Sequence, residues 1–205
     1  FTPGFNTVLL PPWEVTPLAA CFDANNPPSW EIQQMVNAAM QQFQDRYQLN
    51  GNSWPGSDND PITLTWSFVP DGVSIPSGVG EPVANNNLFA QMDDKFGGVA
   101  NRATWIAQFQ SVFDRWAALT GINYTRITVG GNPWDDGAVW GSAGLAGARG
   151  DVRIGMKAID GANGVLAYNS FPTNGDMVLD SAEGWQSTSN TYRFLRNTIS
   201  HEHGH

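Results

Sequence analysis

The stretch ATWIAQFQSVFDRWAALTG, residues 103–121, constrains the fold of this chain more than any other. Its apolar residues recur at the spacing of one helical face, and the glycine at its end is a typical helix stop. These apolar residues are Ile106, Phe109, Phe113, Trp116 and Ala117. The sequence therefore predicts an amphipathic helix from Thr104 to Leu119.

A strand pattern lies before this helix. In PITLTWSFVPDG, apolar and polar residues alternate from Ile62 to Phe68, which is the period of a half-buried strand, and a Pro-Asp-Gly turn follows. INYTRITV and DVRIGM, separated by a glycine-rich loop, also predict strands. Further helices are predicted at residues 88–96 and from about Tyr192 to the last residue.

The N-terminal part of the chain has a different character. Its many prolines before residue 29 exclude a long helix there and predict an extended lead-in. Ser29 is the expected N-cap of a helix over residues 30–49, which Gly51 would end. We therefore divide the chain into an N-terminal extension, residues 1–60, and one main domain, residues 61–205.

Charge and composition narrow the class of protein. Ten basic and nineteen acidic residues give a net charge of −9 without a basic cluster, which argues against a nucleic-acid partner. Apolar runs are too short to span a membrane, and we expect that any targeting segment has been removed or omitted. Cys21 is the only cysteine, so it is either a buried free thiol or bonded to a partner beyond residue 205. The Gly-, Pro- and Asn-rich, Lys-poor composition favours an extracellular protein.

The last residues contain the pattern H-E-x-x-H. On a helix, residues four apart differ by about 40° in direction, so His201 and His205 can chelate one ion. Glu202 is offset by about 100° and His203 by about 200°. This pattern predicts that His201 and His205 bind zinc and that Glu202 is the base that takes a proton from an activated water. On this motif alone, a solvated histidine-rich helix end remains an alternative.

The motif completes an ordered series of patterns. The series is a strand, a long helix, D-x-x-I, D-G-x-x-G-x-L-A-x-x-x-x-P, G-D-x-x-x-D-x-x-E-x-W and H-E-x-x-H. From about Pro61 to His205 it resembles the catalytic domain of the matrixins, the matrix metalloproteinase group of the metzincins, and especially their bacterial secreted relatives. The resemblance implies an α+β fold with a mostly parallel sheet, and a secreted zinc endopeptidase that acts on peptide or protein substrates.

The chain departs from this family at three places. The family's third zinc-binding histidine and its Met-turn would follow His205, so we expect the 205-residue chain by itself to be inactive. The histidines of the family's structural zinc would fall at Tyr168 and Val178, so that zinc site is expected to be absent. His203 stands where the family usually has a bulky apolar residue.

The resemblance also implies a calcium site, because carboxylates and backbone carbonyls are the hard oxygen ligands that Ca²⁺ prefers. Its carboxylates would come from Asp160, Asp180 and Glu183, and its carbonyls from Gly161, Asn163 and Val165. Ordinary turn carboxylates are the alternative. For the acidic pairs Asp93-Asp94 and Asp135-Asp136 we expect a solvated surface in preference to further cation sites.

Between those ligands, GVLAY would form the edge strand of the sheet. In metzincins such an edge binds the peptide substrate by strand addition, which nominates the backbone of Leu166 and Ala167. The same residues are equally compatible with an ordinary buried strand. The rival function is a non-catalytic, calcium-stabilised extracellular binding or adhesion module on the same fold.

Overall fold

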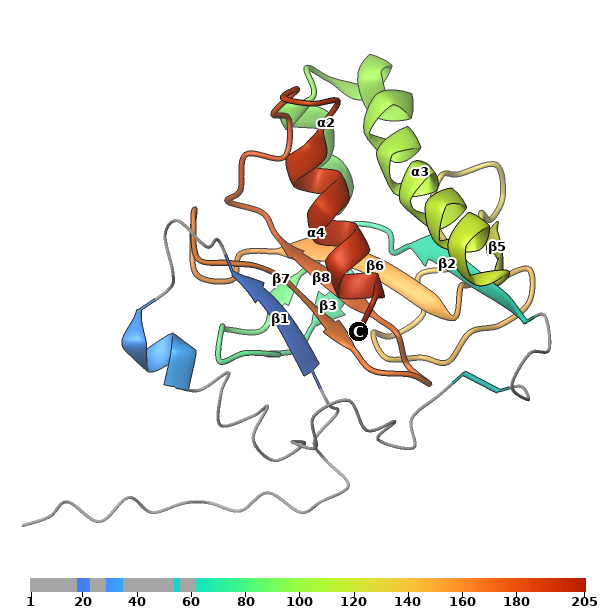
Figure 1. Cartoon of the computed structure of the whole chain (residues 1–205), viewed down its shortest axis with the longest axis horizontal. Coiled ribbons are helices and arrows are strands. Elements are labelled where there is room, and N and C mark those ends of the chain that lie inside the picture. The colour runs from blue at the N-terminus through green and yellow to red at the C-terminus, as the bar shows by residue number, and fades with distance from the viewer. Residues whose placement is uncertain (1–17, 23–28, 35–53, 56–61) are drawn as a thin grey trace, which may run out of the picture.

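The computed structural model describes residues 18–22, 29–34, 54–55 and 62–205, and Figure 1 shows their arrangement. The named elements are β1 (Leu18–Phe22), β2 (Thr63–Phe68), β3 (Ser74–Ile75), β4 (Ala84–Asn85), α2 (Leu88–Lys95), the 3-10 helix η1 (Val99–Asn101), α3 (Arg102–Thr120), β5 (Asn123–Arg126), β6 (Val152–Lys157), β7 (Val165–Ser170), β8 (Met177–Asp180) and α4 (Arg193–His203). In this part of the chain, no helix is both long and apolar enough to cross a membrane.

A six-stranded sheet organises the domain, with the strand order β1-β7-β8-β6-β2-β5. The pairs β2–β5, β2–β6 and β6–β8 are parallel, whereas β7 is antiparallel to both β8 and β1. A short antiparallel pair, β3 and β4, lies apart from this sheet. The predicted α+β fold with a mostly parallel sheet is confirmed.

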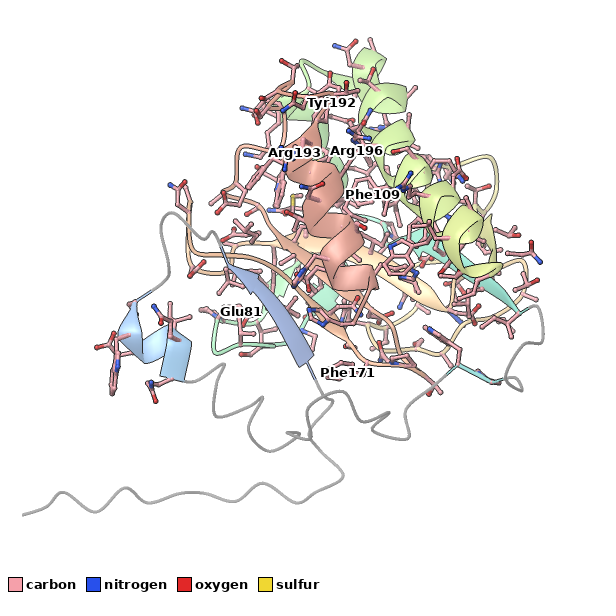
Figure 2. All side chains as sticks on the ribbon, viewed as in Figure 1. Glu81, Phe109, Phe171, Tyr192, Arg193 and Arg196 are labelled. Carbon is pink, nitrogen blue, oxygen red and sulfur yellow. The ribbon has the colours of Figure 1, made fainter. Side chains whose placement is uncertain are left out.

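Helices α3 and α4 lie side by side and pack against each other over the sheet (Figure 1). The core between α3 and the sheet is aromatic: Trp66 stacks on Phe113 at 4.6 Å between ring centroids, and Phe68 meets Phe109 edge to face. Figure 2 labels Phe109 on α3. These four side chains are fully buried. The apolar faces predicted for the helix and the strand therefore meet each other, which positions α3 beside the last helix.

Several predicted elements match the structure with shifted limits. Gly121 ends α3 in the left-handed conformation, with φ of 77°, as its place after the apolar stripe predicts. Within α3, however, Trp105 and Val112 are buried with the two phenylalanines, whereas Ile106 and Trp116 are only half-buried. The stripe is thus rotated slightly from the predicted one.

Only part of the N-terminal segment for which we made predictions lies within the described residues. Residues 30–34 are helical, and the N–H of Ile32 donates a 3.4 Å hydrogen bond to Ser29 Oγ, so Ser29 is the N-cap. The rest of the helix predicted over 30–49 lies outside the described residues. The same holds for the side chain of Cys21, so neither interpretation of its thiol is tested.

The prediction that GVLAY forms the edge of the sheet is wrong. Strand β7 carries β1 on its outer side, with Cα partners that include Cys21 with Ala167 and Ala20 with Tyr168. Sequence periodicity did not show this pairing, because β1 is a short apolar run that lies far from β7 along the chain. Leu166 and Ala167 are buried on β7, and their role in binding substrate remains a prediction.

Candidate metal centre

Helix α4 carries the H-E-x-x-H residues. It packs on α3, and it also contacts β7 and β1. Gly204 caps its C-terminal end, and a Cβ added there would lie 3.0 Å from the Trp116 ring. Close packing against α3 therefore explains a glycine at this position.

His201 and His205 converge. Their Nε2 atoms are 2.9 Å apart, and their ring centroids are separated by 4.6 Å. Partial burial lowers the pKa of His205, and the neighbouring charge of His201 lowers it further. Two imidazole nitrogens that face one point form a donor set suited to Zn²⁺. Among the described residues, no group of three or more His, Cys, Asp or Glu side chains is arranged to hold a metal ion.

Glu202 is the least satisfied polar side chain of this helix. It is fully buried, and neither carboxylate oxygen has a hydrogen-bond partner. Burial raises its pKa to about 8, so in this arrangement the side chain carries a proton at neutral pH. Leaving a buried carboxyl group unpaired is costly, and such groups usually have a functional reason. Together with the convergent imidazoles, Glu202 therefore fits a site built for a cation and a water.

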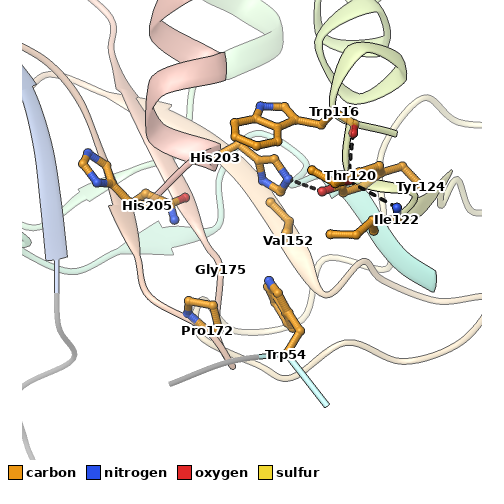
Figure 3. A pocket seen from close by; sticks show the side chains of 12 residues that line it. Trp54, Trp116, Thr120, Ile122, Tyr124, Val152, Pro172, Gly175, His203 and His205 are labelled. Atoms are coloured by element: carbon orange, nitrogen blue, oxygen red, sulfur yellow. Dashed lines mark hydrogen bonds between the residues drawn. The ribbon is translucent and has the colours of Figure 1, made fainter. Parts of the chain in front are cut away.

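His203 points away from His205, as its offset on the helix predicts, and its ring is enclosed by aromatic side chains (Figure 3). Its ring lies among Phe113, Trp116 and Tyr124, and its Nε2 atom is 2.7 Å from the Tyr124 hydroxyl. Burial lowers the pKa of His203 to about 4, so the ring is neutral and the tyrosine hydroxyl can donate to Nε2. The histidine thus packs inward like an apolar side chain, with one hydrogen bond that satisfies its polarity.

A pocket of about 180 Å³ adjoins the end of α4 (Figure 3). Its walls are largely aromatic and apolar, and they include Trp54, Trp116 and Pro172 beside His205. Asn169 also lines it, and the buried Oδ1 atom of this residue has no hydrogen-bond partner. No sequence motif predicts this pocket, because its walls come from segments that share none.

The residues predicted to bind calcium form one hydrogen-bonded loop. The carboxylate of Asp180 accepts from the N–H groups of Asp160 and Gly161, and that of Asp160 accepts from Val165 N–H. Glu183 accepts from Asn163 N–H at 2.6 Å. The loop therefore brings these residues together, while their role as ligands remains a prediction.

The carboxyl groups of that loop lie close enough to affect one another's pKa values. Partial burial raises the pKa of Asp160, and the charge of Asp180 raises it further. Burial raises the pKa of Glu183 in the same way, and again Asp180 adds to the effect. A bound cation would relieve this repulsion between the carboxylates.

The positions of the family's structural zinc hold a different arrangement. Tyr168 donates a 2.8 Å hydrogen bond to Glu81, and Lys157 forms a 2.7 Å ion pair with the same carboxylate. Glu81 also accepts from the N–H groups of Gly78 and Val79, while Val178 is buried in the apolar core. Glu81 and Lys157 were not singled out from the sequence, although a lysine directly after the predicted strand DVRIGM was a usable signal.

The expectation of a solvated surface is wrong for one member of each acidic pair. Asp135 is buried and forms a 2.8 Å ion pair with the fully buried Arg153. Asp93 is also buried, where it pairs with Arg102 and accepts from the Trp105 indole N–H. Both carboxylates therefore form ion pairs with arginine side chains of the same chain.

Two comparisons with known proteins complete the description of this site. A family model described as Matrixin, peptidase family M10, matches residues 85–205, which is more than half of the chain and includes all of α4. A search of curated proteins found no match.

Proposed function

Because this chain belongs to the matrixin family, which is a family of zinc metalloproteases, we propose that it provides the catalytic part of a secreted zinc endopeptidase with Glu202 as general base. The observation that carries the proposal is the unpaired, fully buried carboxyl group of Glu202, which follows His201 on α4, together with the Nε2 atoms of His201 and His205, which are 2.9 Å apart. The acidic, lysine-poor composition supports secretion.

His201 and His205 would hold the metal through their Nε2 atoms. Zinc supplies a Lewis acid that lowers the pKa of a bound water, and its charge favours the ionised form of a nearby carboxylate. Glu202 then takes a proton from the attacking water and passes it to the leaving amine nitrogen. His203 takes no part in this, because it is held among the rings of α3 and β5 and keeps α4 seated.

Within the same proposal, Ca²⁺ occupies the loop of Asp160, Asp180 and Glu183. Support comes from the crowding of three carboxylates in a loop that is fixed by backbone N–H groups. The ion would be structural, since the loop connects β6 to β7 and closes onto the residue that ends β8.

The test is Glu202→Gln in the natural protein expressed from its complete gene. Peptide hydrolysis should fall by at least ~10², the typical contribution of a positioned base, while zinc content stays unchanged. Asp94→Asn, which neutralises an exposed carboxylate on α2, is the matched control and should keep full activity. Retained proteolysis in the glutamine variant would overturn Glu202 as the general base, whereas a binding activity with no proteolysis in the wild type would favour the rival binding module.

A further inference from the structure

A second pocket, of about 350 Å³, lies between α2 and the start of α3, and its size is within the range of ligand-binding pockets. Its walls include Pro70, Phe89, Arg102 and Trp134, and none of its lining residues belongs to the metal centre or to the pocket beside His205. In Figure 1, α2 and the start of α3 lie at one end of the helical layer, and the C-terminal end of α4 lies at the other. The pocket is therefore separate from the proposed catalytic site.

Aromatic rings form the apolar wall of this pocket. The Trp134 ring meets the Phe89 ring edge to face, with 4.9 Å between their centroids, and Pro70 extends the wall. Phe89 is buried, and the guanidinium of Arg102 lies over its ring at 5.1 Å from the centroid. Trp134 is only half-buried. A flat ring that enters the pocket can therefore pack against Trp134 and Pro70.

Asp71 gives the pocket a hydrogen-bond acceptor. Its two carboxylate oxygens accept from the backbone N–H groups of Phe89 and Ala90, at 2.9 and 2.8 Å, and thereby cap the first turn of α2. A carboxylate has about four lone-pair sites, so each oxygen can accept one further hydrogen bond. The capping contacts therefore fix the position of this acceptor without exhausting it.

Arg102 gives the pocket a donor. Every hydrogen bond that it forms with the described residues goes to Asp93, through Nε and Nη2, so the Nη1 group remains available. The hydrogen-bonded carboxylate of Asp93 raises the pKa of Arg102, and the charge of Asp71 raises it further. The guanidinium is therefore positively charged and lies close enough to Asp71 for the two charges to interact.

The opposite charges of Asp71 and Arg102 decide which ligand fits. A cation that approaches Asp71 also meets the guanidinium, and an anion that approaches Arg102 also meets the carboxylate, so neither is favoured. A hydroxyl group can donate to Asp71 and accept from Arg102, and it carries no charge. If the hydroxyl is attached to an aromatic ring, the ring can use the wall formed by Trp134. The phenol group of a tyrosine side chain combines both properties.

We propose that this pocket binds a tyrosine side chain presented by a polypeptide, with the ring on Trp134 and the hydroxyl between Asp71 and Arg102. The domain would then hold a protein at a second place on its surface, away from the metal centre. Recognition at this pocket does not depend on zinc or on catalysis.

An NMR titration of the full chain with N-acetyltyrosinamide tests the proposal, with the indole N–H of Trp134 as the signal. We expect this probe to bind at least roughly tenfold more tightly than N-acetylphenylalaninamide, because its hydroxyl forms hydrogen bonds to charged groups. Asp71→Asn should reduce this preference to less than about threefold, because the charged acceptor is lost. A pentapeptide with one tyrosine between pairs of glycines should bind at least as tightly as 4-methylphenol, since the proposed source is a polypeptide.

A blocking variant distinguishes binding in this pocket from binding elsewhere. Ala90 is exposed and lines the pocket, so Ala90→Phe should fill it and abolish binding of the tyrosine probe, while the backbone N–H that Asp71 caps stays in place. Ala107→Phe is the matched control, because Ala107 is an exposed alanine of α3 that does not line the pocket. This control should bind the probe as tightly as the wild type does.

Several results would overturn the proposal. Absence of tyrosine-probe binding, or equal binding of the tyrosine and phenylalanine probes, would show that the hydroxyl is not recognised. Tighter binding of N-acetylargininamide would show that the pocket takes a cation, and unchanged binding in Ala90→Phe would place the probe elsewhere. Weaker binding of the pentapeptide than of 4-methylphenol would indicate a free phenol as the ligand. None of these measurements needs proteolysis, so their outcome is independent of the Glu202→Gln test.

Discussion

The imidazoles of His201 and His205 face each other across one turn of α4, with their Nε2 atoms 2.9 Å apart. The third histidine of the same helix, His203, instead bonds to the hydroxyl of Tyr124 on β5. Helix α4 thus carries two imidazoles that converge and a third that packs against its neighbours. This difference between the histidines can be tested directly.

We predict that zinc binding depends on His201 and His205 but not on His203. His201→Ala should weaken zinc binding by roughly tenfold or more, since even the loss of an outer-shell partner of a ligand typically costs 10–100-fold in affinity. His203→Phe keeps a ring in the same enclosure and should leave zinc affinity unchanged. Competition with a chromophoric chelator measures both, and equal losses in the two variants would contradict the assignment.

Calcium should stabilise the folded chain. At a hundredfold excess over its dissociation constant, a ligand that binds only the folded state adds about 2.7 kcal/mol to the free energy of unfolding. Asp180→Ala should abolish most of this gain, whereas Asp94→Asn should keep it. Thermal melts with calcium, with zinc and with chelator decide the matter. A melting temperature that does not change with calcium would argue against the calcium site in this loop. A melting temperature that zinc raises in His201→Ala/His205→Ala would show that a structural zinc site is present after all.

Asp176 should make stability depend on pH. It accepts hydrogen bonds from the N–H groups of Arg153 and Gly141, yet burial raises its pKa to about 7. The unfolded value is about 3.9, so between about pH 4 and 7 the folded state binds more protons, and stability falls as pH rises through this window.

Asp176→Asn should remove that contribution. Relative to the wild type, the free energy of unfolding of the variant should rise by up to roughly 1.4 kcal/mol per pH unit within the window and level off above it. Urea unfolding at several pH values, with Asp94→Asn as control, measures the difference. Parallel stability curves for wild type and Asp176→Asn would show that Asp176 does not titrate there.

The ion pair of Glu81 and Lys157 should matter more to stability than the neighbouring tyrosine hydroxyl. Lys157→Met leaves Glu81 buried without its counter-charge, for which a loss of about 3–5 kcal/mol is typical. Tyr168→Phe removes one hydrogen bond and should cost roughly 1 kcal/mol. Chemical denaturation of both variants gives the order, and Glu81→Gln added to Lys157→Met should recover part of the loss.

Local patterns predicted the elements of this domain well. The stripe of α3, the alternation of β2 and the i, i+4 pair on α4 each depend on residues close in the sequence, where helical or strand spacing is decisive. Strand β8 had no such signal, because all four residues of MVLD are buried and no alternation exists.

Distant pairings were missed for a different reason. Glu81 meets Lys157 and Tyr168, and Asp135 meets Arg153, only after the chain has folded. A single acidic residue in a loop has the same local pattern whether it is solvated or buried. Whether the acidic side chain is buried depends on the distant residue with which it pairs, and the spacing of residues in the sequence does not identify that residue.

The antiparallel pairing of β1 with β7 also bears on the order of folding. Residues 18–22 leave the ribosome before every other described strand of the sheet, yet β7, with which they pair, is among the last of these strands to be made. Because contacts between distant segments form slowly, the outer side of β7 passes through a stage in which it is exposed and unpaired. An unpaired β edge is a template for association between chains. Prompt docking of β1 would therefore protect the newly made protein from aggregation.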